Sequence, residues 1–417
     1  MQFVALSTTM YLIAPKRIYS QLKIPPLLMR VFLCTRRKIC KMLSKALFFH
    51  YFGRMKKHLN QLTSSLNEIF TWHKSRVDCF ANLLISLISR QTVNLAHLAA
   101  HFARNTKIES NYRRIQSFFK EVEFDYDRVG HWSIEQMLSN KDKFYLAIDR
   151  TNWQFGKTDI NILMLSAVYE GIAIPLYWEM LPHQGNSKSA LRIKLVKRFV
   201  KQFGTDCIAG ILGDREFIGK DWLDWLNKNG IRFLVRIKAN QITTNSRGLE
   251  VDVSALFYGV KTHEVKNICG KRKFSGMEVY LSGTRDQNGE LLVVASNMGD
   301  AEQLVPIYGM RWEIESLFQA LKGRGFNFEQ THLTDPTKIA KLMALLAVGV
   351  VWAHKVGEYK DAHIKAIKRK KHGRWQYSYF RYGLDMIANA YQKTIITVKD
   401  FNLCLRILRK PIQVLLQ

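Results

Sequence analysis

The sequence predicts an α/β protein in which helices flank a central mixed sheet and further helical regions lie on both sides along the chain. Three observations support this prediction. Strand-like apolar runs follow one another closely between residues 144 and 178. Helix-like and strand-like segments then alternate up to residue 238, which is typical of a sheet covered by helices. Segments with helical spacing of apolar residues precede and follow this middle part.

The chain has 417 residues, enough for two or three domains, and a formal net charge of +29. Such an excess of Lys and Arg predicts a polyanionic partner, either nucleic acid or an anionic membrane. The longest uninterrupted apolar run, Leu342–Ala353, is 12 residues long, which is too short to span a bilayer. Nucleic acid is therefore favoured and no membrane association is expected.

The six cysteines are scattered without a CxxC pair, which excludes zinc-ribbon and zinc-finger spacings and fits a reducing cytoplasm. Residues 1–54 hold ten Lys or Arg and no acidic residue. We expect this basic extension to be disordered or not native, with translation beginning at Met42 or Met55. The rest of the chain still has 53 basic against 34 acidic residues.

Residues 55–140 are predicted to form a helical DNA-binding region. Phe80–Ser89, Val93–Phe102 and Ser110–Lys120 have helical spacing of apolar residues. The last of these carries Arg113 and Arg114, which are candidate DNA contacts. Two readings remain open here: a helix-turn-helix-like DNA reader, and a plain helical bundle with a basic surface.

The next part, residues 141–239, is predicted to alternate between strands and helices. Strands are expected at Phe144–Ile148, Ile160–Tyr169, Ile172–Trp178, Cys207–Leu212 and Phe233–Lys238, and helices at about Lys188–Phe203 and Lys220–Asn229. Residues 240–303 are rich in strand-like runs, and Asn288-Gly289 between two of them predicts a hairpin turn.

The remaining chain divides into residues 304–345, with a polar helix, and a helical C-terminal region, 346–417. The latter contains a basic run with Lys368 and Arg369 beside several aromatic residues. Cations next to aromatic rings suit backbone contact and base stacking on nucleic acid, so these two residues are candidate DNA contacts. A solvated basic face over a small aromatic core is the alternative.

Two aspartates follow predicted buried strands. Asp149 comes after Phe144–Ile148, and Asp214 comes after Ile208–Leu212 and Gly213. We expect both at strand ends, where a rigid strand gives way to a loop open to solvent and a charge can be held at a fixed point. A single aspartate in such a place is common and would mean little alone.

Four residues of the 304–345 segment have offsets that place them together. Tyr308, Arg311, Glu315 and Lys322 are at relative positions 0, 3, 7 and 14. On one helix they would fall within roughly 60° of one another, presenting a carboxylate flanked by a phenol and two cations. Such a face suits a phosphate next to a metal ion, although Arg311 and Glu315 alone would read as an ordinary surface ion pair.

Asp149, Asp214 and Glu315 together form a candidate metal site. Three converging carboxylates repel one another unless cations neutralise them, and two Mg²⁺ ions would do so. Oxygen ligands without His or Cys favour Mg²⁺, or Mn²⁺ in its place, over zinc.

At this point the sequence resembles a known family. The spacing Y-x2-R-x3-E-x6-K, met by Tyr308, Arg311, Glu315 and Lys322, is similar to the signature of IS4-type DDE transposases such as the Tn5 and Tn10 enzymes. Ala147-Ile148-Asp149-Arg150-Thr151 and Gly213-Asp214-Arg215-Glu216-Phe217 resemble the two aspartate motifs of that family. The likeness extends over about residues 60–390.

The resemblance implies a ribonuclease-H-like core, in residues 141–239 and 304–345, interrupted by a β-rich insertion at 240–303. It implies that Asp149, Asp214 and Glu315 bind two Mg²⁺ ions and that Tyr308, Arg311 and Lys322 hold phosphates. The implied activity is nicking, hairpin formation and opening, and strand transfer at the terminal inverted repeats of a bacterial insertion sequence. The implied partners are double-stranded DNA, at the element ends and the target, and a second copy of the chain in a synaptic complex. The implied location is the cytoplasm, with the nucleoid when bound.

One departure from the family concerns the hairpin step. The family uses large side chains of the insertion to flip a base, but no Trp occurs here between Trp225 and Trp312. Phe257, Tyr258 or Met277 are the substitutes that the sequence offers. The alternative functions are a ribonuclease-H-like nuclease without strand transfer and a transposase-derived DNA-binding regulator without catalysis.

Overall fold

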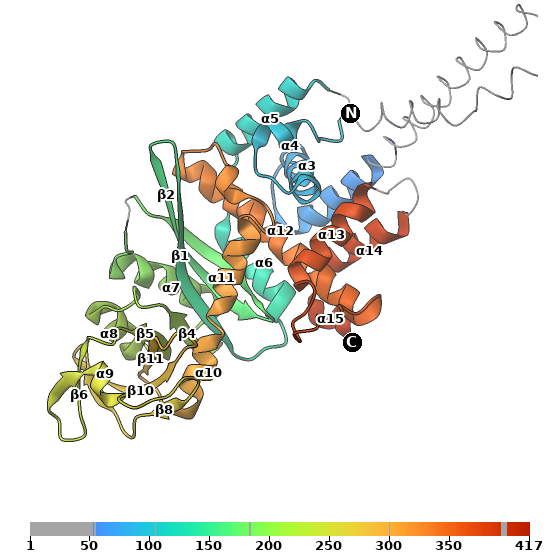
Figure 1. Cartoon of the computed structure of the whole chain (residues 1–417). Coiled ribbons are helices and arrows are strands. Elements are labelled where there is room, and N and C mark those ends of the chain that lie inside the picture. Colours follow the sequence, from blue (N-terminus) through green and yellow to red (C-terminus); the bar gives the residue numbers. More distant parts are fainter. Residues whose placement is uncertain (1–52, 54–55, 105, 183–184, 300, 393–397) are drawn as a thin grey trace, which may run out of the picture. The chain divides into compact units, whose positions relative to one another are not determined.

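The computed structural model describes residues 53, 56–104, 106–182, 185–299, 301–392 and 398–417 (Figure 1). The basic extension expected at residues 1–54 therefore lies outside the described residues, apart from Gly53.

The central sheet begins with five strands in the order β3-β2-β1-β4-β5. They are β1 (Phe144–Phe155), β2 (Thr158–Tyr169), β3 (Ile172–Met180), β4 (Ile208–Gly213) and β5 (Phe233–Ile237). The first three form an antiparallel meander, while β4 is parallel to β1 and β5 is parallel to β4. Helices α7 (Ser189–Phe203) and α8 (Lys220–Lys228) make the crossovers that parallel neighbours require. This is the strand order of a ribonuclease-H-like fold, so the predicted fold class is confirmed.

The β-rich stretch continues this sheet. Strand β11 (Leu291–Ser296) pairs antiparallel with β5, β10 (Met277–Arg285) pairs with β11, and β8 (Val265–Asn267) follows at the edge. The other elements are β6 (Ile242–Thr244), β7 (Glu250–Asp252), α9 (Val253–Leu256) and β9 (Arg272–Phe274). The turn predicted at Asn288-Gly289 lies between β10 and β11, with Gly289 at a φ of 78°.

The two faces of β1 meet different helices, because successive side chains of a strand point to opposite sides. Phe144 packs its ring edge against Phe199 of α7, with ring centroids 6.2 Å apart. Asp149 and Trp153 are in the opposite alternation and face the region of α11 (Trp312–Leu321) and the residues after it. Figure 1 shows α11 lying across the strands.

Helices make up both ends of the described chain. Residues 56–69 are helical, followed by α3 (Lys74–Arg90), α4 (Leu95–Ala99), α5 (Ile108–Glu121) and α6 (Tyr126–Leu138). After α10 (Leu304–Gly309) and α11 come α12 (Pro336–His363), α13 (Tyr379–Gln392), α14 (Val398–Arg409) and α15 (Ile412–Leu416). Short 3-10 turns lie at Ala301–Gln303 and Phe328–Gln330.

Helix α12 is the central core helix. Asp335 caps it, accepting from the backbone N–H groups of Thr337 and Lys338, and Pro336 occupies its first turn. It is long and apolar enough to cross a membrane, but 94% of its most apolar window is buried inside the protein. A helix that is apolar on all sides and surrounded by protein is typical of a core.

Helices α12 and α13 approach each other at two glycines. A Cβ atom on Gly357 would lie 1.8 Å from the carbonyl oxygen of Tyr379, and one on Gly383 would lie 1.8 Å from that of Ala353. No other residue fits at either position without moving a backbone, so the glycines permit close packing of the two helices.

Candidate active site

Strand pairing brings the two aspartates together. In the parallel register of β1 and β4, Ile148 lies opposite Gly213, so Asp149 and Asp214 follow at neighbouring positions on adjacent strands. Asp214 lies directly after β4, as expected. Gly213 permits the tight turn there, since a Cβ at this position would come within 2.9 Å of the Phe217 Cβ atom.

The expected position of Asp149 beyond the end of its strand is wrong. Strand β1 continues for six residues and pairs with β2 as far as Phe155 opposite Thr158. The apolar run ends at Ile148, but the hydrogen-bond ladder does not, because β2 supplies the partner strand. Asp149 therefore lies inside a strand, where it is paired with Met164 of β2, one residue beyond the last pair between β1 and β4.

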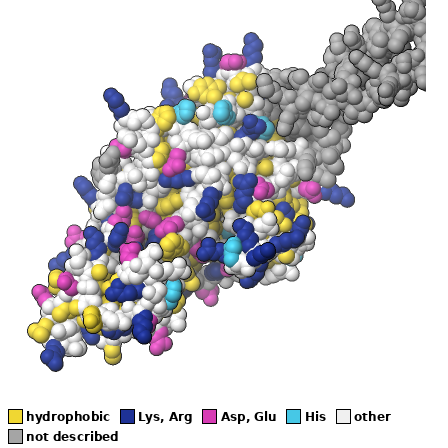
Figure 2. All heavy atoms as spheres, viewed as in Figure 1, with side chains coloured by type: hydrophobic (Ala, Val, Ile, Leu, Met, Phe, Trp, Pro, Cys, Tyr) yellow, Lys and Arg dark blue, Asp and Glu magenta, His cyan; other side chains and the backbone are white. Residues whose placement is uncertain are grey.

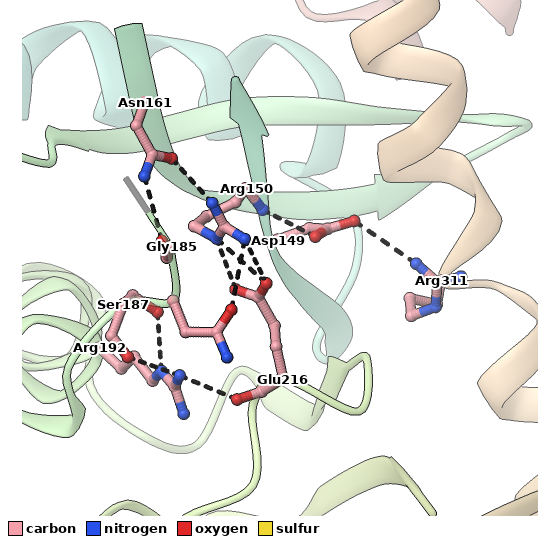
Figure 3. Close-up of polar contacts among 9 residues, drawn as sticks. Asp149, Arg150, Asn161, Gly185, Ser187, Arg192, Glu216 and Arg311 are labelled. Atoms are coloured by element: carbon pink, nitrogen blue, oxygen red, sulfur yellow. Dashed lines mark hydrogen bonds and ion pairs between the residues drawn. The ribbon is translucent and has the colours of Figure 1, made fainter. Parts of the chain in front are cut away.

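A largely buried ion pair ties the two aspartate segments to each other (Figure 3). Arg150 donates from Nε and Nη2 to both carboxylate oxygens of Glu216 at 2.8 to 3.1 Å, and from Nη1 to Asn161 Oδ1 at 3.1 Å. The side chains of Arg150 and Glu216 are only 15% and 18% exposed. Arg192 donates to the Glu216 carbonyl oxygen at 2.9 Å, and burial lowers the pKa of Arg192 to about 10.

The sequence alone gave no role to the pair of Arg150 and Glu216. The available signal was a charged residue close after each aspartate: Arg150 directly follows Asp149, and Glu216 lies two residues after Asp214. Figure 3 shows Arg150 and Asp149 pointing to different sides of β1, Arg150 toward Glu216 and Asp149 toward Arg311. Arg150 thus ties β1 to the segment that follows β4, while its side chain points away from that of Asp149.

The expected single helix from Tyr308 to Lys322 is also wrong. Tyr308 lies on α10, Arg311 precedes α11, Glu315 lies in the first turn of α11, and Lys322 follows its last residue. Between the helices the backbone bonds change to i−3 partners, as from Arg311 N to Tyr308 O and from Ile314 N to Arg311 O. Gly309, a poor helix former, immediately precedes this tightened turn.

Arg311 links the helix to the sheet. Its guanidinium donates to Glu315 Oε1 at 2.7 Å and approaches Asp149 Oδ2 at 3.5 Å. The Arg311 side chain is 7% exposed. Burial alone would lower the pKa of Arg311, but Tyr308, Glu315 and Asp149 together raise it above its ordinary value. Burial raises the pKa of Asp149 to about 7, although the Arg150 N–H and Arg311 act against the rise.

The other two residues of the motif are placed differently. Tyr308 is 2% exposed, and its hydroxyl has no hydrogen-bond partner among the described residues. Lys322 donates to the Asn152 carbonyl oxygen at 3.3 Å, pairs with Glu329 at 2.8 Å and lies over the Trp153 ring. Tyr308 therefore lies in the core against Arg311, whereas Lys322 lies nearer the surface against the outer half of β1.

Asp149 and Asp214 offer the hard oxygen donors that a divalent metal ion requires. The Asp214 Oδ1 atom is buried and has no hydrogen-bond partner among the described residues, and an unsatisfied buried carboxylate oxygen is suited to a cation. Among the described residues no three His, Cys, Asp or Glu side chains converge as a ready metal-binding group. The two aspartates fit an ion, and Glu315 is connected to them only through Arg311.

The candidate DNA contacts outside this site fall into two kinds. Arg113 is exposed, whereas Arg114 is half-buried and pairs with Asp78 at 2.9 Å. Lys368 and Arg369 are exposed on the loop between α12 and α13, where the Arg369 guanidinium lies 4.4 Å from the centroid of the Trp375 ring. None of these four is near the three acids in sequence or in any contact described above.

Comparison with known proteins identifies the class of this chain. Residues 143–352 match the family described as "Transposase DDE domain". The chain therefore belongs to this family of DDE transposases, and membership implies DNA cleavage and joining. The matched range begins one residue before β1 and ends within α12, so it includes all three acids.

Solved structures with similarity to the chain are distant. The piggyBac transposase synaptic complex with hairpin DNA has 13% identity and a TM-score of 0.41, covering 88% of this chain and 85% of that one. The Argonaute of Marinitoga piezophila in complex with guide RNA and target DNA has 12% identity and a TM-score of 0.21, covering 58% and 35%. No curated protein matches the chain. The family assignment rests on the match over residues 143–352.

Proposed function

We propose that this chain is an IS4-type transposase that nicks DNA at the terminal inverted repeats of an insertion sequence and joins the freed ends to target DNA. The observation that carries the proposal is the placement of Asp149 in β1 next to Asp214, which directly follows β4, with a buried Asp214 oxygen that lacks a hydrogen-bond partner among the described residues. Glu315 completes the set of acids on α11, within hydrogen-bonding distance of the same arginine that approaches Asp149.

Asp149, Asp214 and Glu315 would hold two Mg²⁺ ions, for which Mn²⁺ can substitute. Bound there, the ions would activate a water molecule or a 3′-hydroxyl and stabilise the oxygen that leaves phosphorus. Arg311 and Lys322 would hold phosphates of the DNA end, since guanidinium and ammonium groups neutralise them directly. Tyr308 would bind phosphate only after a movement that exposes its hydroxyl. Without such a movement it would position Arg311, whose guanidinium lies over the Tyr308 ring.

The finer steps are part of the same proposal. We expect cut-and-paste transposition through a DNA hairpin, a homodimeric synaptic complex with C-terminal contacts, and a cytoplasmic protein that associates with the nucleoid when bound. Arg113, Arg114, Lys368 and Arg369 would contribute to DNA contact. For Arg114 this requires exchange of its ion pair with Asp78.

A cleavage and joining assay tests the proposal. The substrate is a duplex carrying the DNA that flanks the gene, with Mg²⁺ and a second DNA as target. Asp214→Asn should lower nicking at least about 100-fold, because even partners outside the metal ligands cost 10- to 100-fold when removed. DNA binding should be retained, because the cations remain.

Asp221→Asn is the matched control, since Asp221 is an exposed aspartate at the start of α8 in the same part of the chain. It should nick at the wild-type rate. Wild-type nicking by Asp214→Asn would refute the assignment of the acids. Nicking without joining would instead identify a nuclease, and binding without nicking a regulator.

A further inference from the structure

A cavity of about 860 Å³ lies against α11, the helix that carries Glu315. Its walls come from α11, the turn between β2 and β3, and the segment that leads into α13. Helix α11 contributes Ser316, Gln319, Ala320 and then the nearby Gly323, at helical spacing. Asp149, Asp214 and Glu315 do not line it, so the cavity is a separate site that shares a helix with Glu315.

One wall of the cavity holds a buried imidazole that makes no hydrogen bond to another described residue. His354 of α12 is 1% exposed, and neither of its ring nitrogens has a hydrogen-bond partner among the described residues. Its ring lies edge-on between Tyr169 and Tyr379, at centroid distances of 5.6 and 5.5 Å. Glu358 Oε2 lies 3.9 Å from His354 Nε2, which is beyond hydrogen-bonding distance. Buried polar atoms are normally hydrogen-bonded, so an imidazole without such a bond in a cavity wall suits a ligand with polar edges.

The rim of the cavity carries exposed aromatic rings. Trp375 and Tyr377 are 52% and 42% exposed, and both line the cavity. Trp375 belongs to a short hairpin in which Arg369 pairs with it across a β-bridge. Backbone bonds from Lys370 N to Arg374 O and from Gln376 N to Lys368 O hold this hairpin in shape. The rings are thus presented on an ordered loop.

The same loop is strongly basic. Between Ile364 and Ser378 it contains six Lys or Arg residues and no acidic residue: Lys365, Lys368, Arg369, Lys370, Lys371 and Arg374. Arg324 and Arg381 add cations to the wall, of which Arg381 pairs with Asp385 at 2.7 Å. Arg324 is exposed and forms no ion pair with another described residue. Glu170 is the acidic residue of the wall.

These features select one class of ligand. We propose that the cavity binds unpaired nucleotides of a DNA strand, with bases stacked on Trp375 and Tyr377 and phosphates neutralised by Arg324 and the basic loop. Base stacking on aromatic rings needs open base faces, which a single strand has and a duplex does not. A polar residue of the wall can then meet the edge of an inserted base. The proposal deepens the proposed function, on which it rests, by placing unpaired DNA next to the helix of Glu315.

Binding of fluorescein-labelled dT20 and of a labelled 20-base-pair duplex, both in EDTA, tests the proposal. The double variant Trp375→Ala with Tyr377→Ala should bind dT20 at least about tenfold more weakly, while duplex binding changes less than about twofold. Trp375→Phe should retain most of the affinity, because it keeps an aromatic face. Equal loss for both DNAs, or no loss for dT20, would overturn the proposal.

Ile364→Ala is the matched control, since Ile364 is 51% exposed at the start of the same loop and does not line the cavity. It should leave dT20 binding unchanged. A second readout uses dT20 carrying 5-iodouracil: irradiation should crosslink it to Trp375 or Tyr377, located by peptide mass mapping. Crosslinks confined to other regions would place the single strand elsewhere and refute the site.

The design separates this inference from the proposed function. No metal is present in the binding assay, so its outcome does not depend on cleavage. If Asp214→Asn nicks like the wild type while the double variant loses dT20 binding, the catalytic proposal fails and the cavity assignment stands. If nicking depends on Asp214 but dT20 binding is unchanged by the loss of both aromatic residues, the cavity assignment fails and the catalytic proposal stands.

Discussion

The sheet side of the candidate site, with Asp149 and Asp214, is held by strand pairing and by the Arg150–Glu216 ion pair. The helix side, with Arg311 and Glu315, begins at a tightened turn after Gly309, and the contact from Arg311 to Asp149 is a long 3.5 Å. One side is therefore fixed before any ligand arrives. The helix side is joined to the sheet side by the Arg311 side chain, and a cation bound at Asp149 would compete with Arg311 for that carboxylate.

This difference has a chemical meaning. In the proposed mechanism, Asp149 and Asp214 would receive a metal ion without moving their backbones, because two strands position them. Glu315 shares its present partner, Arg311, with Asp149, so the guanidinium stands where positive charge is needed. A positive ion at Asp149 would repel Arg311 and free Glu315 to act as a ligand.

The largest expected effect comes from breaking the sheet side. Arg150→Met leaves the Glu216 carboxylate largely buried and without its guanidinium, and removing one partner of a buried pair typically costs about 3 kcal/mol or more. Urea denaturation should show this loss of unfolding free energy. The double variant Arg150→Met with Glu216→Gln should lose less than the single variant, because no charge is left unpaired.

Arg236→Met provides the matched control for that experiment. Arg236 of β5 pairs with Glu290 beside β11, but Glu290 is 60% exposed, so water replaces the lost partner. We expect a loss below about 1 kcal/mol. Equal losses for Arg150→Met and Arg236→Met would show that the sheet side is not specially held.

A second prediction concerns pH and Asp149. Its pKa of about 7 lies above the ordinary value of 3.8, so the folded protein keeps a proton that the unfolded chain loses between about pH 4 and 7. The unfolding free energy contributed by Asp149 therefore falls as the pH rises through this window, by about 4 kcal/mol at about 1.4 kcal/mol for each pKa unit. Asp149→Asn should flatten the profile by that amount.

The difference between the two profiles isolates Asp149, because Glu358, whose pKa burial also raises to about 7, is present in both proteins. Mg²⁺ added at pH 8 should raise the melting temperature of the wild type more than that of Asp149→Asn, since only the wild type has the carboxylate. If the unfolding free energies of the wild type and of Asp149→Asn changed in parallel with pH, burial of the ionised Asp149 carboxylate would not be costly.

The smallest expected effect tests the outer edge of the helix side. Lys322→Ala should reduce the slope of log affinity against log salt concentration by about one unit for a DNA duplex, as expected for one lost phosphate contact. Lys338→Ala is the control, because Lys338 also pairs with an acid and is 38% exposed, but lies at the start of α12. An unchanged slope for Lys322→Ala would show that Lys322 remains with Glu329 and does not bind phosphate.

Local patterns predicted the sheet well. Each apolar run between residues 144 and 238 became a strand, and the neighbouring positions of Asp149 and Asp214 follow from two such runs ending in the same way. The polar half of β1 escaped prediction because its pairing partner, β2, and not its own sequence, keeps it extended. The ion pair between Arg150 and Glu216 joins residues 66 positions apart, a separation at which no periodicity gives a signal.

The helix side was harder to predict for a related reason. The offsets of Tyr308, Arg311 and Glu315 fit one helix face, and the backbone stays helical in conformation at Met310 and Arg311. After Gly309 the backbone hydrogen bonds change from i−4 to i−3 partners, which rotates the later side chains away from the face of the earlier ones. The amino-acid composition of the segment gives no sign of this change. The cavity depends on α11 meeting a loop about 50 residues further along the chain, which no local pattern shows.

The glycine contact between α12 and α13 determines how the basic loop can behave. Gly357 and Gly383 bring the two helices into backbone contact on either side of residues 364–378. The two helices that flank the loop are consequently packed against each other at this crossing. The six positive charges are then carried by a loop whose two ends are held in place. A polyanion that binds them would therefore lose little conformational entropy in ordering the loop.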